Sequence, residues 1–204
     1  GISVIQTAEG ALTEVHSILQ RVRDLAVQAG SDSNNADSRT AIKTEIDSLG
    51  KELTRVAAST NFNGIKLLDS ASTLTFQVGA GSDADEDQIA VTLTDFSGLG
   101  ARIEALTVTD AAAALTTIAA LDTEIKGVST ARAGLGAVQN RFESTINSLQ
   151  VSAENLAAAK SRIADTDMAA EMVKYTASNI LQQAGTAMLA QANQSGQGVL
   201  QLLR

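Results

Sequence analysis

Apolar residues recur at alternating steps of three and four along the start of the chain. They are Ile5, Ala8, Leu12, Val15, Leu19, Val22, Ala26 and Ala29. This spacing is typical of a helix that packs through a coiled-coil-like seam. A second seam follows a short polar segment, at Ile42, Ile46, Leu49, Leu53 and Val56. Because the polar segment (residues 31–38) is short, the two seams predict an antiparallel helical hairpin.

The period then changes from the helical to the strand type. Apolar residues alternate with polar ones at Leu74, Phe76 and Val78, and again at Ile89, Val91 and Leu93. Two such runs around a loop at residues 79–87 predict a β-hairpin with one apolar face. Asn63-Gly64 is a turn signal before the hairpin, and residues 95–100 are expected to be a connector.

A helical period returns at residue 111 and continues to Ile163. A continuous helix of this length would be about 80 Å long, so we expect an elongated rod. The segment Ala-Asp-Thr-Asp at residues 164–167 interrupts the pattern, and a last helix runs toward Arg204. The predicted fold is mainly α: a rod of long antiparallel helices with a coiled-coil-like core and one small β-hairpin region, residues 64–108.

The composition supports closely packed helices and excludes several kinds of site. Alanine occurs 35 times, and the 204 residues include no Cys, Pro or Trp and one His. Without cysteine there is no disulfide, thiol nucleophile or Cys-ligated zinc. The net charge of −8 argues against nucleic acid or an anionic membrane as partner. No run of residues is apolar enough to predict a transmembrane segment.

Two features were candidates for chemistry. Residues 83–87, Asp-Ala-Asp-Glu-Asp, begin like a calcium loop but lack its later glycine and glutamate. A solvated acidic turn is the favoured interpretation, with an adventitious divalent-ion site as the alternative. His16 is favoured as a helix-surface residue over a catalytic base, since no nucleophile is evident nearby. We therefore predict no enzymatic activity, metal or cofactor.

Residues 175–203 carry no charge and are rich in Ala, Gln and Leu. Apolar, charge-poor faces normally mark an interaction surface, so we predict assembly through this segment, the alternative being a helix packed within its own chain. On the first helix, Arg21, Asp24 and Gln28 face away from the seam and Leu25 lies at its margin. From the residues alone, this face is a solvated surface, with Leu25 widening the core.

The sequence resembles bacterial flagellin in motifs that follow one another in the family's order. They are LQRVRDLAVQA (residues 19–29), TNFNGIKLL (60–68), FQVGA (76–80), LGAVQNRFESTINSL (135–149), SRIADTDMAAE (161–171), ILQQAGTAMLAQANQ (180–194) and LLR (202–204). The resemblance implies a structural subunit of the flagellar filament. It also implies two domains: a rod domain at residues 1–165, and the carboxy-terminal half of the inner filament-core domain at residues 166–204.

Two departures from the family are expected. The chain begins without Met in what reads as mid-helix, so it is interpreted as truncated, without the amino-terminal helix that pairs with the carboxy-terminal one in flagellins. Only residues 95–109 stand where flagellins carry variable outer domains, which are therefore expected to be absent.

The resemblance also implies partners, secretion and a place in the extracellular flagellum. The partners are other flagellin subunits, a flagellar export chaperone, the filament cap and hook-junction proteins, and the animal Toll-like receptor for flagellin. The assembly and chaperone-binding residues would be Ile180, Leu181, Ala184, Met188, Leu189, Leu200 and Leu203. The receptor-binding residues would be Gln20, Arg21, Asp24, Leu25, Gln28 and Glu45. We expect the helical hairpin to bring Glu45 back alongside Arg21 and Leu25, with an offset of about 9 Å along the helices between Leu25 and Glu45.

Two alternatives stay open at this stage. A hook–filament junction protein would share the terminal helices, and a helical adhesin or receptor ligand would share the elongated shape. The uncharged final helix favours the filament subunit, because an adhesin has no use for an assembly helix.

Overall fold

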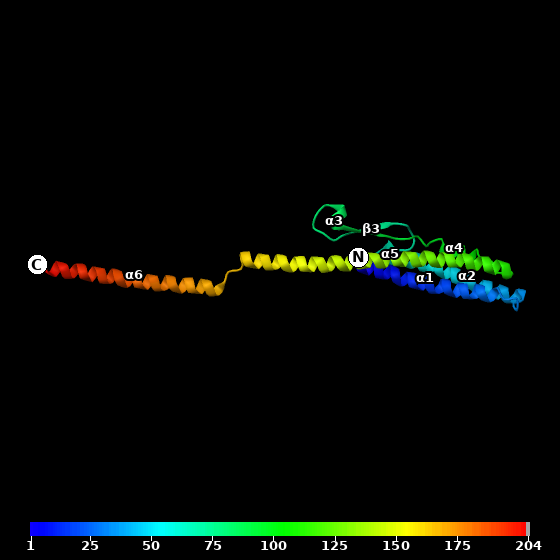
Figure 1. Ribbon diagram of the computed structural model, residues 1–204, viewed down its shortest axis with the longest axis horizontal. Helices are drawn as coiled ribbons and strands as arrows, with labels where there is room; N and C mark the ends of the chain where they lie inside the picture. Colours follow the sequence, from blue (N-terminus) through cyan, green and yellow to red (C-terminus); the bar gives the residue numbers. More distant parts are fainter. Residues whose placement is uncertain (203–204) are drawn as a thin grey trace. The chain divides into compact units, whose positions relative to one another are not determined.

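The computed structural model describes the backbone of residues 1–202 and the side chains of residues 1–198 (Figure 1). Its elements are α1 (Ile2–Ala29), α2 (Ala36–Ser59), β1 (Asn61–Phe62), β2 (Ile65–Lys66), β3 (Thr73–Gln77), α3 (Ala84–Asp87), β4 (Gln88–Thr92), α4 (Leu99–Glu104), α5 (Ala111–Ala164) and α6 (Met168–Leu202). The prediction of a mainly α chain with long helices and a small β-hairpin region is confirmed.

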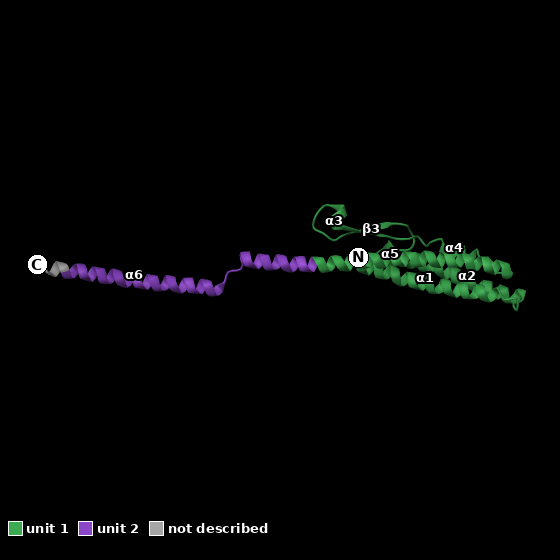
Figure 2. Cartoon of the chain, in the orientation of Figure 1, with its two compact units in different colours: residues 1–148 green, residues 149–204 purple. Residues whose placement is uncertain are grey.

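The chain divides into two compact units, Gly1–Ser148 and Leu149–Arg204 (Figure 2). The first unit contains α1 to α4, all four strands and most of α5. The second contains the last part of α5 and α6. The domain boundary expected from the sequence, after residue 165, falls in the break between α5 and α6 rather than at Ser148.

Helix α1 supplies the largest share of the core of the first unit. All eight residues of its predicted seam are buried, and Val4, Ile18 and Leu25 are buried as well. The buried stripe is wider than a coiled-coil seam because α1 packs against α2 on one side and faces α5 on the other. Each fully buried Leu or Ile side chain of this stripe contributes about 1.5–3 kcal/mol relative to an exposed one.

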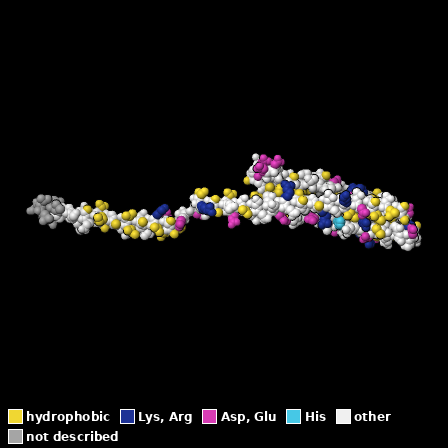
Figure 3. Space-filling view, viewed as in Figure 1, with side chains coloured by type: hydrophobic (Ala, Val, Ile, Leu, Met, Phe, Trp, Pro, Cys, Tyr) yellow, Lys and Arg dark blue, Asp and Glu magenta, His cyan; other side chains and the backbone are white. Residues whose placement is uncertain are grey.

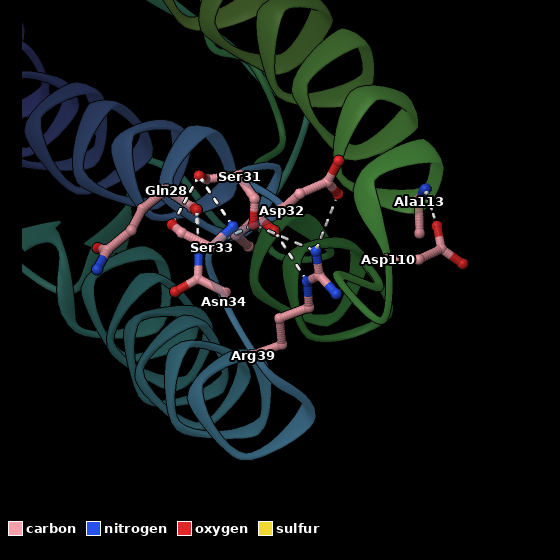
Figure 4. A network of polar contacts seen from close by, with 9 residues as sticks. Gln28, Ser31, Asp32, Ser33, Asn34, Arg39, Asp110 and Ala113 are labelled. Carbon is pink, nitrogen blue, oxygen red and sulfur yellow. Dashed lines mark hydrogen bonds and ion pairs between the residues drawn. The ribbon is translucent and has the colours of Figure 1, made fainter.

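The turn between α1 and α2 is held by side chains of its own residues and of α2 (Figure 4). The guanidinium of Arg39 donates to the carbonyl oxygens of Ala29 (3.0 Å) and Ser31 (3.2 Å). The amide of Asn34 donates to the carbonyl oxygen of Gln28 at 2.6 Å. These bonds satisfy carbonyl groups that the end of a helix leaves without partners. The Asn35 side chain then accepts from the amide of Ser38 and caps α2.

Two hairpins follow α2. Strands β1 and β2 pair around Asn63 and Gly64, which have φ angles of 50° and 81°. Strands β3 and β4 pair antiparallel, which confirms the predicted hairpin, and Phe76 lies opposite Ile89. The apolar face of this hairpin packs on the core through the buried Ile89 and Val91 of β4.

The expected connector at residues 95–100 is shorter than predicted, because Leu99 and Gly100 already belong to helix α4. This helix has only six residues, too few to show a helical period. It crosses α2 where a glycine stands on each side, Gly50 and Gly100. Both glycines are buried, and a Cβ on Gly50 would lie 3.1 Å from the Gly100 carbonyl oxygen and 2.7 Å from Cγ of Glu104.

The long helix predicted from residue 111 is confirmed as α5, Ala111–Ala164. Asp110 begins it by accepting the backbone N–H of Ala113 at 2.7 Å, also visible in Figure 4. The last of its buried residues in the first unit is Phe142. The predicted interruption is confirmed too, since α6 begins at Met168 with the Asp167 carboxylate accepting from the amide of Ala169 at 2.9 Å.

Replacing Gly100 with alanine is predicted to destabilise the first unit by about 1–3 kcal/mol, the usual cost of forcing extra atoms into a packed site. A Cβ at this position would meet the Gly50 carbonyl oxygen and would lie 2.9 Å from the backbone nitrogen of Thr54. Urea unfolding followed by circular dichroism measures the change.

The matched control is Gly127→Ala in α5, where a Cβ meets no atom within 4 Å. This change should stabilise the helix by about 0.5–1 kcal/mol, because alanine loses less backbone entropy than glycine. A Gly100→Ala variant as stable as the parent would show that the α2–α4 crossing is not closely packed.

Candidate functional site

An ion pair between α1 and α2 lies on the exposed side of the hairpin. Nε and Nη2 of Arg21 both donate to Oε1 of Glu45, at 2.9 and 2.6 Å. The two side chains remain 57% and 44% exposed. The hairpin therefore brings these two predicted site residues into direct contact.

Other predicted residues of α1 lie on the same exposed face. Gln20, Asp24 and Gln28 are all exposed, and the Gln20 amide lies 2.9 Å from Nε2 of His16. Gln20 and Asp24 also line an open hollow of about 370 Å³ together with Arg23, Asp122 and Ile125. The face is thus continuous from α1 onto α5.

The α5 side of this hollow was not predicted from the sequence. Nε of Arg23 donates to Oδ1 of Asp122 at 2.7 Å, which links residues far apart in the chain. This hydrogen bond, with the attraction of the carboxylate, raises the pKa of the Arg23 guanidinium above its usual value. No local pattern marks the pair, because it depends on the register between α1 and α5.

The burial of Leu25 agrees with the interpretation from the residues alone, in which it widens the core, and disagrees with the receptor contact that the resemblance implied. Leu25 is 2% exposed and belongs to the hydrophobic core, so its side chain is not available for contact with a partner in this conformation. The α1 stripe is wide enough to include Leu25 because the helix is covered from two sides. Of the apolar residues near Arg21, the exposed one is Val27, at 51%.

The acidic segment at residues 83–87 lies on the surface of the first unit. Among the described residues, no group of three or more His, Asp or Glu side chains is placed to hold a metal ion. Residues 84–87 form the short helix α3, capped by the Asp83 side chain, and the acidic side chains gather there in Figure 3.

None of the helices within residues 1–202 is long and apolar enough to cross a membrane.

The second candidate surface is α6. Up to residue 198, its large apolar side chains are 57–73% exposed, and they include four of the predicted assembly residues: Ile180, Leu181, Met188 and Leu189. Ala184 is exposed as well. The side chain of Leu200 and the whole of Leu203 lie outside the described residues.

Within residues 149–198, no part of the second unit covers these side chains. From residue 149 to residue 198 no residue is buried, and Asn179 alone is half-buried. Met172, Val173, Thr176 and Ile180 line a shallow hollow of about 380 Å³ along the helix. Figure 3 shows apolar side chains along α6 and few charged ones. An apolar helix of this kind is typical of a surface that a partner covers.

The two surfaces and the fold define a class of protein: a helical structural subunit that associates through exposed helices. The chain matches two family descriptions, "Bacterial flagellin N-terminal helical region" over residues 1–73 and "Bacterial flagellin C-terminal helical region" over residues 118–203. Together they cover most of the sequence. The chain belongs to the bacterial flagellin family.

Individual relatives agree with this assignment. The chain is 50% identical to a flagellin of Halalkalibacterium halodurans and 46% identical to a flagellin of Bacillus subtilis; the alignments span the whole chain and 75% and 78% of the relatives. The crystal structure of Bacillus cereus flagellin superposes with a TM-score of 0.64 at 33% identity, covering 78% of this chain and 90% of that one.

Family membership decides between the alternatives left open by the sequence. The chain is a subunit of the bacterial flagellar filament that assembles with other flagellin subunits. Flagellins are structural proteins, which confirms the prediction that the chain is not an enzyme.

Truncating Leu25 is predicted to act through stability rather than through a lost surface contact. Leu25→Ala should lower the free energy of unfolding by about 2–5 kcal/mol, as expected for a leucine removed from a packed core. Thermal or urea unfolding of the variant measures this loss. Val27→Ala is the control, because the Val27 side chain is half exposed on the same helix turn. A Leu25→Ala variant no less stable than Val27→Ala would place Leu25 on the surface.

Proposed function

We propose that the two parts of this flagellin subunit have separate places in the filament. Residues 1–165 form the rod domain of the middle layer, and residues 166–204 contribute to the inner domain around the central channel. The support is the contrast in burial between the parts. The first unit has its own core, whereas the described apolar side chains of α6 have no cover within residues 149–198. If the inner domain is completed only by neighbouring segments, the apolar side chains of α6 are exposed in the single subunit.

The same exposed helix supports a role before assembly. The subunit is secreted through the flagellar export apparatus into the extracellular flagellum, and a flagellar export chaperone covers α6 until then. Filament cap and hook-junction proteins are further partners at the two ends of the filament. Large exposed apolar side chains without interspersed charge promote aggregation. A chaperone that covers α6 would prevent this aggregation before assembly.

Hydrogen exchange should distinguish the two regions in the free subunit. The amides of α6 are predicted to exchange far faster than those of residues 114–142 in α5, since a helix without tertiary packing is marginally stable in water. Adding a purified flagellar export chaperone should protect α6 and leave residues 114–142 unchanged. Equal protection of both regions in a verified monomer would contradict the proposal.

Charged substitutions on α6 test the chaperone contact directly. Leu181→Asp and Met188→Asp should each weaken chaperone binding about tenfold or more, equivalent to about 1.4 kcal/mol. Gln183→Asp is the matched control, because it adds the same charge to the same helix at a polar position. If all three variants bind equally well, the chaperone uses another surface.

The exposed face of α1 supports a second role. We propose that this face is a ligand of the animal Toll-like receptor for flagellin, centred on the Arg21–Glu45 pair. Arginine suits such a centre because its planar guanidinium makes several directed hydrogen bonds. Gln20, Asp24 and Gln28 add polar contacts around it. Leu25 supports the face from the core, below the exposed side chains.

The Arg21–Glu45 pair is the observation that carries this second proposal. Glu45 uses one carboxylate oxygen for both hydrogen bonds from Arg21. This arrangement holds the guanidinium in one orientation while more than half of the Arg21 side chain stays accessible. An ordered and accessible arginine loses less entropy on binding than a free one.

Arg21→Ala is predicted to weaken receptor binding by about 1–3 kcal/mol, in the range of interface hot spots. Glu45→Ala should weaken it as well, because Arg21 then loses its fixed orientation. Glu14→Ala, on an exposed position two turns earlier in α1, should have little effect. Calorimetric titration with the receptor ectodomain measures the three affinities, and circular dichroism checks that helix content is unchanged. If Arg21→Ala binds the receptor as tightly as the parent, the proposal is contradicted and this face is an ordinary solvated surface.

A further inference from the structure

The turn between β1 and β2 presents an asparagine in an unusual setting. Asn63 and Gly64 alone connect the two strands, and both have positive φ angles. Such a two-residue turn is typical of tight hairpins, in which asparagine and glycine tolerate this backbone best. Asn63 is exposed, and a Cβ placed on Gly64 would meet no atom within 4 Å.

Asn63 differs from the other asparagines in two ways. The sequence has nine asparagines, and Asn63 is the one followed by glycine. Five of the others lie in α5 and α6, where the helix fixes the backbone. The remaining three have hydrogen-bonded side chains: Asn34 with the Gln28 carbonyl, Asn35 with the Ser38 amide and Asn61 with the Ser59 carbonyl. Within the described part of the chain, the Asn63 side chain makes no hydrogen bond.

We propose that Asn63 is a site of spontaneous deamidation in the folded subunit. The backbone nitrogen of Gly64 loses its proton to hydroxide and attacks the side-chain carbonyl carbon of Asn63. The new N–C bond closes a five-membered succinimide ring, and the bond to the side-chain nitrogen breaks. This nitrogen takes a proton from water, which regenerates hydroxide, and leaves as ammonia. Water then opens the ring at either carbonyl and yields aspartate or isoaspartate.

The fold permits the movement that ring closure requires. The backbone of Asn63 must rotate about its Cα–C bond to bring the Gly64 nitrogen to the side chain. Strands β1 and β2 have two residues each, all of them exposed. Such a short hairpin opens locally at low free-energy cost without unfolding the helical core. The missing side chain of Gly64 removes the usual steric obstacle to the attacking nitrogen.

The product would change a defined piece of surface. Either acid adds one negative charge at the turn, and isoaspartate also adds a methylene group to the main chain. Phe62 and Ile65 on either side of the turn are 37% and 44% exposed. Together with Val4, Leu74 and Phe76 they line an apolar hollow of about 210 Å³. An aged subunit would therefore present a charge and a longer turn beside this hollow.

Mass spectrometry of the intact folded chain tests the proposal. The protein is incubated at mildly alkaline pH, with circular dichroism to confirm that it stays folded, and is then digested with trypsin. The peptide of residues 56–66 reports on the site, and electron-transfer fragmentation separates aspartate from isoaspartate. We expect Asn63 to convert faster than the other eight asparagines and its rate to rise with pH.

Two variants and one reference state complete the experiment. Asn63→Gln should abolish the modification of this peptide, since glutamine would have to close a larger ring, whereas Asn61→Gln should leave it unchanged. A parallel incubation in urea gives the rate for the unfolded chain. If Asn63 keeps its amide in the folded protein while the urea sample loses it, the turn protects the residue and the proposal is overturned. Equal conversion of all nine asparagines would overturn it as well.

Discussion

The first unit depends on the burial of one helix from two sides. Helix α1 faces α2 through one part of its apolar stripe and α5 through the other, and it has more buried residues than any other helix of the unit. Ion pairs flank both contacts: Arg21 with Glu45 toward α2, and Arg23 with Asp122 toward α5. These exposed pairs contribute little stability by themselves, but they align the helices around the stripe. The receptor-facing surface proposed above is the outer side of this arrangement.

Most of this arrangement could be predicted from residue spacing. The heptad-like positions of α1 and the alternation in β3 and β4 locate their buried residues directly, because each pattern repeats over several turns or residues. The exceptions have physical reasons. Val4 and Ile18, outside the predicted seam, are buried because α1 has two neighbours, and the periodicity of one helix does not reveal how many helices cover it. Helix α4 was missed because six residues cannot show a period. The Arg23–Asp122 contact depends on a register between distant segments, which no local motif encodes.

The two candidate surfaces also differ in how much the sequence reveals. The absence of charge from residues 175–203 marks α6 as an interaction surface without any structure. The α1 face, by contrast, has an ordinary polar composition. Its residues are identified as a candidate site only by the contact between Arg21 and Glu45 and by the resemblance to flagellins. An exposed hydrophobic surface can be recognised in a sequence because exposing apolar side chains to water is unfavourable and therefore rare. A polar recognition surface has the same composition as any solvated surface, so the sequence does not distinguish it.

The pairing of α1 with α5 has a consequence for the order in which the subunit forms. The residues of α5 that cover the second side of α1 lie between Ala114 and Phe142, about a hundred residues later in the chain. During synthesis from the amino end, α1 and α2 can form their hairpin early, since their contacts are local. The apolar side chains that α1 directs toward α5 stay uncovered until about a hundred further residues have been made. The nascent subunit is therefore a half-covered helical hairpin for a long interval. During this interval other chains and chaperones can contact its apolar side chains, until α5 has been synthesised.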